Sequence, residues 1–150
     1  TIKLKIWDIW HETNDPKINA DFFRGIGLMH NGNLKESIKY FSKVIEKNPN
    51  FAEAWNKRAT VFYMLGEYDK SMTDINTTLK LEPRHFGAMD GMILIFLQTG
   101  KVDQAVKIYD EIIKIFPKSK STLKAKKKLL NYNNNSAKLW SISSRAQSCV

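Results

Sequence analysis

MLGEYDKSMTDI (residues 64–75) sets the architecture of this chain, because the same pattern occurs twice more without a gap. HNGNLKESIKYF (30–41) precedes it and QTGKVDQAVKIY (98–109) follows it. Each copy holds a glycine near its start and is followed by an apolar-rich run that stops at a proline. These residues are Gly32, Gly66 and Gly100, and Pro49, Pro83 and Pro117. Two residue types that share one period indicate three structural repeats.

Each repeat is predicted to be a pair of helices. The apolar stripe of the first helix of the second repeat recurs at steps of three and four residues, as one face of a helix requires. Its members are Ala52, Trp55, Ala59, Phe62 and Leu65. Gly66 permits the left-handed backbone that ends this helix and starts a tight turn. A second helix is predicted over 68–81, and Pro83 prevents its continuation because proline lacks an N–H.

Such a hairpin cannot bury its apolar face alone, so the repeats must stack into an all-α solenoid. We expect repeats over 18–51, 52–85 and 86–118. The apolar residues of 1–17, which include Trp7 and Trp10, predict a capping helix over the first repeat. A basic capping helix over 119–132 and a flexible tail over 133–150 complete the predicted organisation.

All the excess charge lies near the C-terminus. The chain has 150 residues and a formal net charge of +9, but its 15 acidic residues all precede Lys114 and are matched there by as many basic ones. Clustered lysines can bind phosphate groups or an anionic membrane surface, and they can equally form the solvated face of a terminal helix. The possible contacts are Lys120, Lys124, Lys127 and Lys128.

Motifs for catalysis or metal binding are not found in the sequence. The three histidines stand far apart and outside an HExxH pattern, and the single cysteine, Cys149, cannot complete a metal site. We therefore expect neither an enzyme nor a cofactor nor a small-molecule substrate. The longest nearly apolar run, 92–97, is too short to cross a bilayer, so no membrane-spanning segment is expected.

The repeats resemble the tetratricopeptide repeat (TPR) family. The second repeat carries its pattern of aromatic, small, glycine and proline positions most fully, through Trp55, Ala59, Phe62, Gly66, Tyr68, Ser71, Leu79 and Pro83. Asp21 and Met89 depart from it, since the family prefers tryptophan there, and so does Ile93, where it prefers a small residue. The resemblance implies a right-handed solenoid of three 34-residue hairpins that acts as a protein-protein interaction module.

In this family the first helices of the repeats line a concave groove for a peptide or helix of a partner. The groove residues that the resemblance implies here are Phe22, Phe23, Ile26, Met29, Asn56, Lys57, Thr60, Tyr63, Met64, Leu94, Leu97 and Gln98. His30, Glu53 and Asp90 are placed beside them. Members that grip acidic chaperone tails use a clamp of Lys, Asn and Arg. The matching positions hold Phe22, Ile26, Lys57, Gly87 and Gly91, so we expect an apolar or amphipathic ligand instead.

A narrower resemblance links AEAWNKRATVFYMLGEYDKS (52–71) and LEPRHFGAMDGM (81–92) to alphaproteobacterial proteins that carry such repeats behind an export signal. It implies the periplasm or cell envelope. Two alternatives to groove binding stay open, namely binding of nucleic acid or an anionic membrane through the C-terminal lysines, and weak self-association through Trp7, Trp10 or Trp140. A monomer or a weak homo-oligomer is expected.

Overall fold

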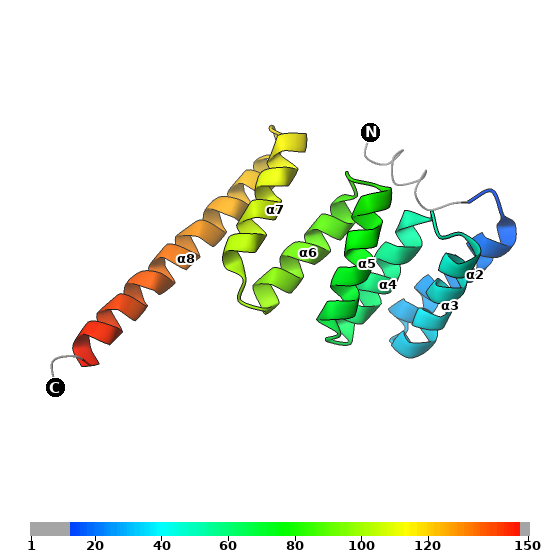
Figure 1. Cartoon of the computed structure of the whole chain (residues 1–150), viewed down its shortest axis with the longest axis horizontal. Coiled ribbons are helices and arrows are strands. Elements are labelled where there is room, and N and C mark those ends of the chain that lie inside the picture. The colour runs from blue at the N-terminus through cyan, green and yellow to red at the C-terminus, as the bar shows by residue number, and fades with distance from the viewer. Residues whose placement is uncertain (1–12, 148–150) are drawn as a thin grey trace. The chain divides into compact units, whose positions relative to one another are not determined.

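The computed structural model describes residues 13–147, and over this range the chain is helical and contains no strand. The helices are α2 (Pro16–His30), α3 (Leu34–Lys47), α4 (Ala52–Met64), α5 (Tyr68–Leu81), α6 (Phe86–Gln98), α7 (Val102–Ile115) and α8 (Lys120–Gln147), as Figure 1 shows. The predicted all-α repeat fold is confirmed. None of the helices in the described range is long and apolar enough to cross a membrane.

A left-handed glycine closes the first helix of every repeat. Gly32, Gly66 and Gly100 have φ angles of 77°, 75° and 71°. After α2, the Gly32 N–H donates to the Met29 carbonyl at 3.1 Å, and the Asn33 N–H donates to the Leu28 carbonyl at 2.9 Å. The same two bonds recur after α4 and α6. This paired bonding satisfies carbonyls that the helix end leaves open, so the chain can reverse within a few residues.

The second helices stop where the prolines require it. α3 ends at Lys47, α5 at Leu81 and α7 at Ile115, each two residues before its proline. A proline restrains the residue before it to an extended backbone and offers no N–H for another helical bond. The predicted span of 68–81 for the second helix of the middle repeat is therefore confirmed.

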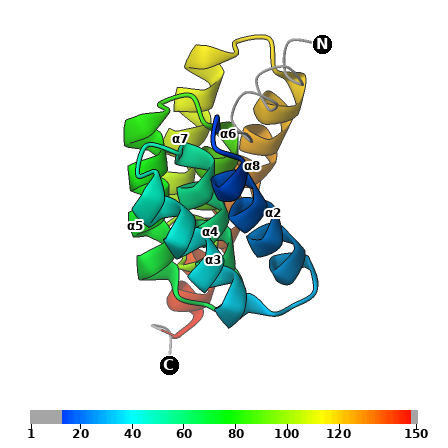
Figure 2. The same ribbon diagram turned by 90° about the vertical axis from the view of Figure 1, so that its right-hand side faces the viewer.

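The chain divides into two compact units inside α6, between Ile95 and Phe96. The first unit holds the hairpins α2/α3 and α4/α5, whose helices run side by side in Figure 1 and Figure 2. In this unit α3 also packs against α4, so the second helix of one repeat contacts the first helix of the next. In the second unit α7 packs against α8.

Aromatic rings form the core of the first hairpin. Phe22 of α2 is fully buried, with its ring centroid 5.8 Å from that of Phe41 and 4.9 Å from that of Phe51. Gly25 lets the two helices approach, because a Cβ atom at this position would lie 2.8 Å from the Phe41 ring. Close approach of α2 and α3 therefore depends on the absence of a side chain at Gly25.

In each hairpin of the first unit, one buried serine forms a hydrogen bond between the two helices. The Ser37 hydroxyl donates to the Gly25 carbonyl at 2.8 Å, and the Ser71 hydroxyl donates to the Ala59 carbonyl at 2.7 Å. The two bonds are equivalent under the 34-residue repeat. The corresponding residue of the third repeat is Ala105, which has no hydroxyl to donate.

The C-terminal segment differs from the prediction of a short helix followed by a flexible tail. α8 continues through the asparagine run to Gln147, so residues 133–147 are helical. Neither glycine nor proline follows Pro117, and hence no residue of that segment interrupts the helix. The predicted N-terminal capping helix, with Trp7 and Trp10, lies outside the described residues except for its last five positions. Cys149 also lies outside them.

The aromatic core makes a direct prediction for stability. Phe22→Ala should lower the free energy of unfolding by about 3–5 kcal/mol, because it removes a fully buried ring and leaves a cavity between Phe41 and Phe51. Phe23→Ala is the matched control, since Phe23 is 49% exposed, and should cost about 1 kcal/mol or less. Urea unfolding followed by circular dichroism measures both. Equal losses would contradict the assignment of Phe22 to the core.

Candidate binding surface

The first helices of the repeats keep large apolar side chains in contact with water. Phe23 on α2 is 49% exposed, Met64 on α4 is 52% exposed, and Leu94 on α6 is 48% exposed. Thr60 is also exposed, one turn before Met64 on α4, and Tyr63 is half-buried. These residues belong to the first unit, and we refer to Phe23, Thr60, Tyr63, Met64 and Leu94 as the first-helix surface. Apolar side chains that stay exposed on the same helix of each repeat are candidates for contact with another molecule.

Several residues expected in the groove lie in the interior instead. Phe22 and Met29 belong to the hydrophobic core, and Ile26 packs against it. Glu53 is fully buried and Asn56 is 6% exposed. For these residues the sequence-based placement is corrected, because the repeat turns the helix face that carries them toward neighbouring helices. Phe22 and Met29 then serve packing, which explains their apolar character without a ligand.

The remaining predicted residues are spread over both units. Leu97 and Gln98 are exposed. They follow the division in α6 and belong to the second unit, whereas Leu94 precedes it. His30 and Asp90 are exposed in the first unit. The four lysines expected to contact anions are all exposed on α8, and they are Lys120, Lys124, Lys127 and Lys128.

A buried charged network stands next to the first-helix surface. The Glu53 carboxylate lies 2.6 Å from Nε2 of His85 and 2.9 Å from the ammonium of Lys57. Nδ1 of His85 accepts a hydrogen bond from the Ala88 N–H at 3.2 Å, so in the neutral ring the proton sits on Nε2 and is donated to Glu53. The Asn56 amide donates to the same carboxylate at 3.3 Å. His85 thereby connects α4 to the first turn of α6.

The network determines the protonation of Glu53. Burial by itself raises the pKa of this carboxyl, but the hydrogen bond from His85 and the charge of Lys57 outweigh burial and hold the pKa below its usual value. Glu53 is therefore a carboxylate at neutral pH. Since its charge neutralises that of Lys57, the one basic residue at a clamp position already has a partner within the protein.

The position of His85 in the 34-residue repeat is a sequence signal that could have predicted this network. His85 stands 34 residues after Phe51, which is a core residue 7% exposed, and His85 itself is fully buried. A titratable side chain at a core position needs a partner, and Glu53 is the acid that the fold brings to it. A Cβ atom at Gly87 would lie 3.3 Å from the Asn56 amide nitrogen, so this clamp position is also crowded.

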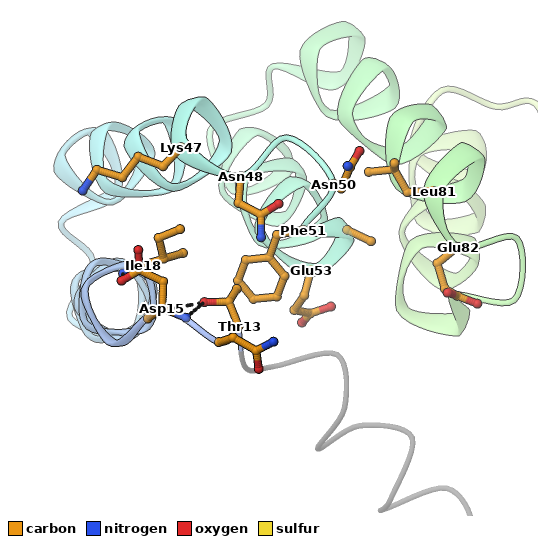
Figure 3. Close-up of a pocket in the computed structure, with 12 residues that line it drawn as sticks. Thr13, Asp15, Ile18, Lys47, Asn48, Asn50, Phe51, Glu53, Leu81 and Glu82 are labelled. Carbon is orange, nitrogen blue, oxygen red and sulfur yellow. Dashed lines mark hydrogen bonds between the residues drawn. The ribbon is translucent and has the colours of Figure 1, made fainter.

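The first unit also contains a pocket of about 710 Å³ near the ends of four helices (Figure 3). Its lining combines apolar with charged side chains, among them Ile18, Phe51, Lys47, Glu53 and Glu82. In the described part of the chain no group of three or more His, Cys, Asp or Glu side chains is arranged to hold a metal ion. The pocket therefore offers a mixed polar wall without a recognisable metal centre.

The sign of the Glu53 pKa shift predicts how stability depends on pH. A lowered pKa means that the unfolded chain binds more protons, so the stability from Glu53 is present above the usual glutamate pKa of about 4.3 and is lost as pH falls through the lower folded value. Glu53→Gln should cost about 1–3 kcal/mol at pH near 7 and flatten this acid dependence. Unfolding by urea across the acid range measures both effects. The exposed Glu46→Gln is the control, and an equal cost in both variants would exclude the network as a source of stability.

Three comparisons place the chain among known proteins. A family model described as "Psidin, N-terminal TPR repeats region" matches residues 27–129. A TPR repeat-containing protein of Rhizobium etli is 36% identical over 108 residues, which cover 72% of this chain and 53% of that protein. The chain thus spans about half the length of this relative.

Solved structures agree in fold. The first TPR of Spaghetti (RPAP3), bound to the HSP90 peptide SRMEEVD, superposes with a TM-score of 0.71 at 16% identity and covers 81% of this chain and 99% of that one. The Sgt2 TPR domain of Aspergillus fumigatus gives a TM-score of 0.69 at 16% identity and covers 81% and 83%. The family model, which matches more than half of the chain, shows together with the three 34-residue repeats that the chain belongs to the tetratricopeptide repeat family.

Proposed function

We propose that this chain is a non-enzymatic interaction module that binds an apolar or amphipathic segment of a partner protein on its first-helix surface. The observation that carries the proposal is the exposure of Phe23, Met64 and Leu94, each about half open to water on the first helix of successive repeats. Apolar residues that serve only packing are buried in this fold, as Phe22 and Phe41 are. A bound ligand would cover the apolar side chains that the fold leaves exposed.

The chemistry of the surface favours apolar contacts over a charged clamp. Met64 is flexible and polarizable, so it can adapt to side chains of different shape, while the Phe23 ring offers a flat contact. The hydroxyl of Thr60 already donates to the Asn56 carbonyl at 3.0 Å, and its oxygen remains able to accept a bond from a ligand. Lys57 is held by Glu53 at 2.9 Å, which weakens its attraction for an acidic tail.

The peptide-bound neighbour supports the class of ligand but not its identity. The RPAP3 domain was solved with an HSP90 peptide, so this fold can bind a peptide. At 16% identity the likeness concerns the fold alone. The positions that departed from the clamp pattern, Phe22, Ile26, Gly87 and Gly91, carry no charge here. We therefore expect the peptide SRMEEVD to bind this chain weakly or not at all.

The proposal predicts that truncating the exposed apolar side chains of the first-helix surface abolishes partner binding. The triple variant Phe23→Ala, Met64→Ala, Leu94→Ala should lose protein partners that the wild-type chain captures from cells of its own source, and an identified partner should bind at least about tenfold more weakly. Mass spectrometry identifies the partners, and calorimetry with the purified partner measures the affinity.

The control variant is Leu123→Ala, Leu130→Ala, Tyr132→Ala, which removes three exposed apolar side chains from α8. It should retain the partners that the first triple variant loses, because it leaves the first-helix surface intact. Retention of every captured partner by the first triple variant would overturn the proposal. Circular dichroism of both variants checks that helicity is unchanged, as expected when exposed side chains are truncated.

A further inference from the structure

We infer that the face of α8 turned away from α7 docks an acidic amphipathic helix of a partner protein. This surface shares no residue with the first-helix surface and lies in the second unit. Three features of the described part of α8 carry the inference: a row of lysines without acidic partners, two exposed leucines spaced by two helical turns, and the lack of any acid on the helix.

Burial identifies which side of α8 faces the protein. The half-buried positions follow one another at steps of one, three or four residues, and they are Thr122, Ala125, Lys126, Leu129 and Asn133. With 3.6 residues per turn these positions form one stripe, which packs against α7. Asn133 lines a small pocket with residues 100–104, at the start of α7, so the two helices run antiparallel.

The opposite side of α8 is basic. By the same helical spacing, the four exposed lysines (120, 124, 127 and 128) lie across the helix from the α7-facing stripe. Among residues 13–135 none of these four forms an ion pair. Of the three acids of α7, Asp110 pairs with Lys126 at 2.5 Å and Glu111 pairs with Lys114 at 2.6 Å, while Asp103 stands in the first turn of α7.

Two leucines stand along one edge of the lysine row. Leu123 is 45% exposed and Leu130 is 38% exposed. Their separation of seven residues places them on the same side of the helix, two turns apart, as the apolar positions of a helix-helix seam are spaced. Lys120 and Lys127 are spaced in the same way and lie beside the leucines. A helix that packed on the leucines would thus meet ammonium groups along its edge.

Charge complementarity indicates which kind of partner binds this face of α8. A second copy of α8 would bring lysines against lysines, because the chain contains no acid after Glu111. A polyanion such as RNA, or an anionic lipid surface, would neutralise the lysines but would not need Leu123 or Leu130. A helix with an apolar stripe at every seventh residue and glutamates along its edge covers the leucines and the lysines together.

The test uses the full chain and synthetic probes. The first probe is a labelled helical peptide of about three heptads with leucine at every seventh position and glutamate beside it, and the second replaces the glutamates with glutamine. Single-stranded RNA of about 20 nucleotides and vesicles containing phosphatidylserine are the other arms. Fluorescence anisotropy and vesicle sedimentation measure binding in low and in physiological salt.

The variants separate the lysines from the leucines. We expect the acidic peptide to bind the wild-type chain, and to bind at least about tenfold more weakly when the four lysines 120, 124, 127 and 128 become glutamine or when Leu123 and Leu130 become alanine. The control changes four exposed lysines outside α8 to glutamine, namely Lys17, Lys35, Lys80 and Lys107. It removes the same total charge and should retain peptide binding.

Three results would overturn the inference. One is that the acidic and glutamine peptides bind equally well or not at all. Another is that the leucine variant binds the acidic peptide as the wild-type chain does. The third is that RNA or vesicles bind more tightly than the acidic peptide and are unaffected by the leucine variant, which would assign the lysines to polyanions. Circular dichroism of each variant confirms that α8 is still formed.

Discussion

The whole architecture depends on the chain reversing direction through a left-handed residue every 34 positions. A helix that buries one apolar stripe is stable only if a second helix returns along it, and the return must begin within three residues of the first helix end. Gly32, Gly66 and Gly100 supply this turn with positive φ angles of 71–77°. A side chain there would strain the backbone, and the hairpins would no longer meet in the register that places Ser37 and Ser71 under their partner carbonyls.

The Glu53–His85 network shows how the interior of a repeat protein can constrain its surface. Burying a carboxylate is unfavourable unless hydrogen bonds and an opposite charge compensate, and here His85, Asn56 and Lys57 do so. As a consequence, Lys57 is committed to the interior, and the start of α6 is connected to α4. The availability of Lys57 to a ligand at the first-helix surface is therefore set by a carboxylate that is itself fully buried.

The two surfaces differ in the physics by which they would bind. The first-helix surface offers apolar side chains with few free charges, so its affinity would come from burial of apolar area and would change little with salt. The α8 surface carries four lysines and no acid, and its affinity would fall as salt screens the lysines. Because the surfaces belong to different units, each can be altered without changing the residues of the other.

Local sequence determined the repeats, and tertiary contacts decided the sites. Helix bounds, glycine turns and proline stops follow from residues adjacent in the chain, because backbone conformation is restricted locally. Burial depends on which helices meet, so Phe22, Glu53 and Met29, placed by the sequence in a groove, lie inside the protein. His85 could have been flagged by its register with Phe51, but its pairing with Glu53 joins residues 32 positions apart. The asparagine run after Leu130 similarly suggested a tail, whereas the absence of glycine and proline lets the helix continue to Gln147.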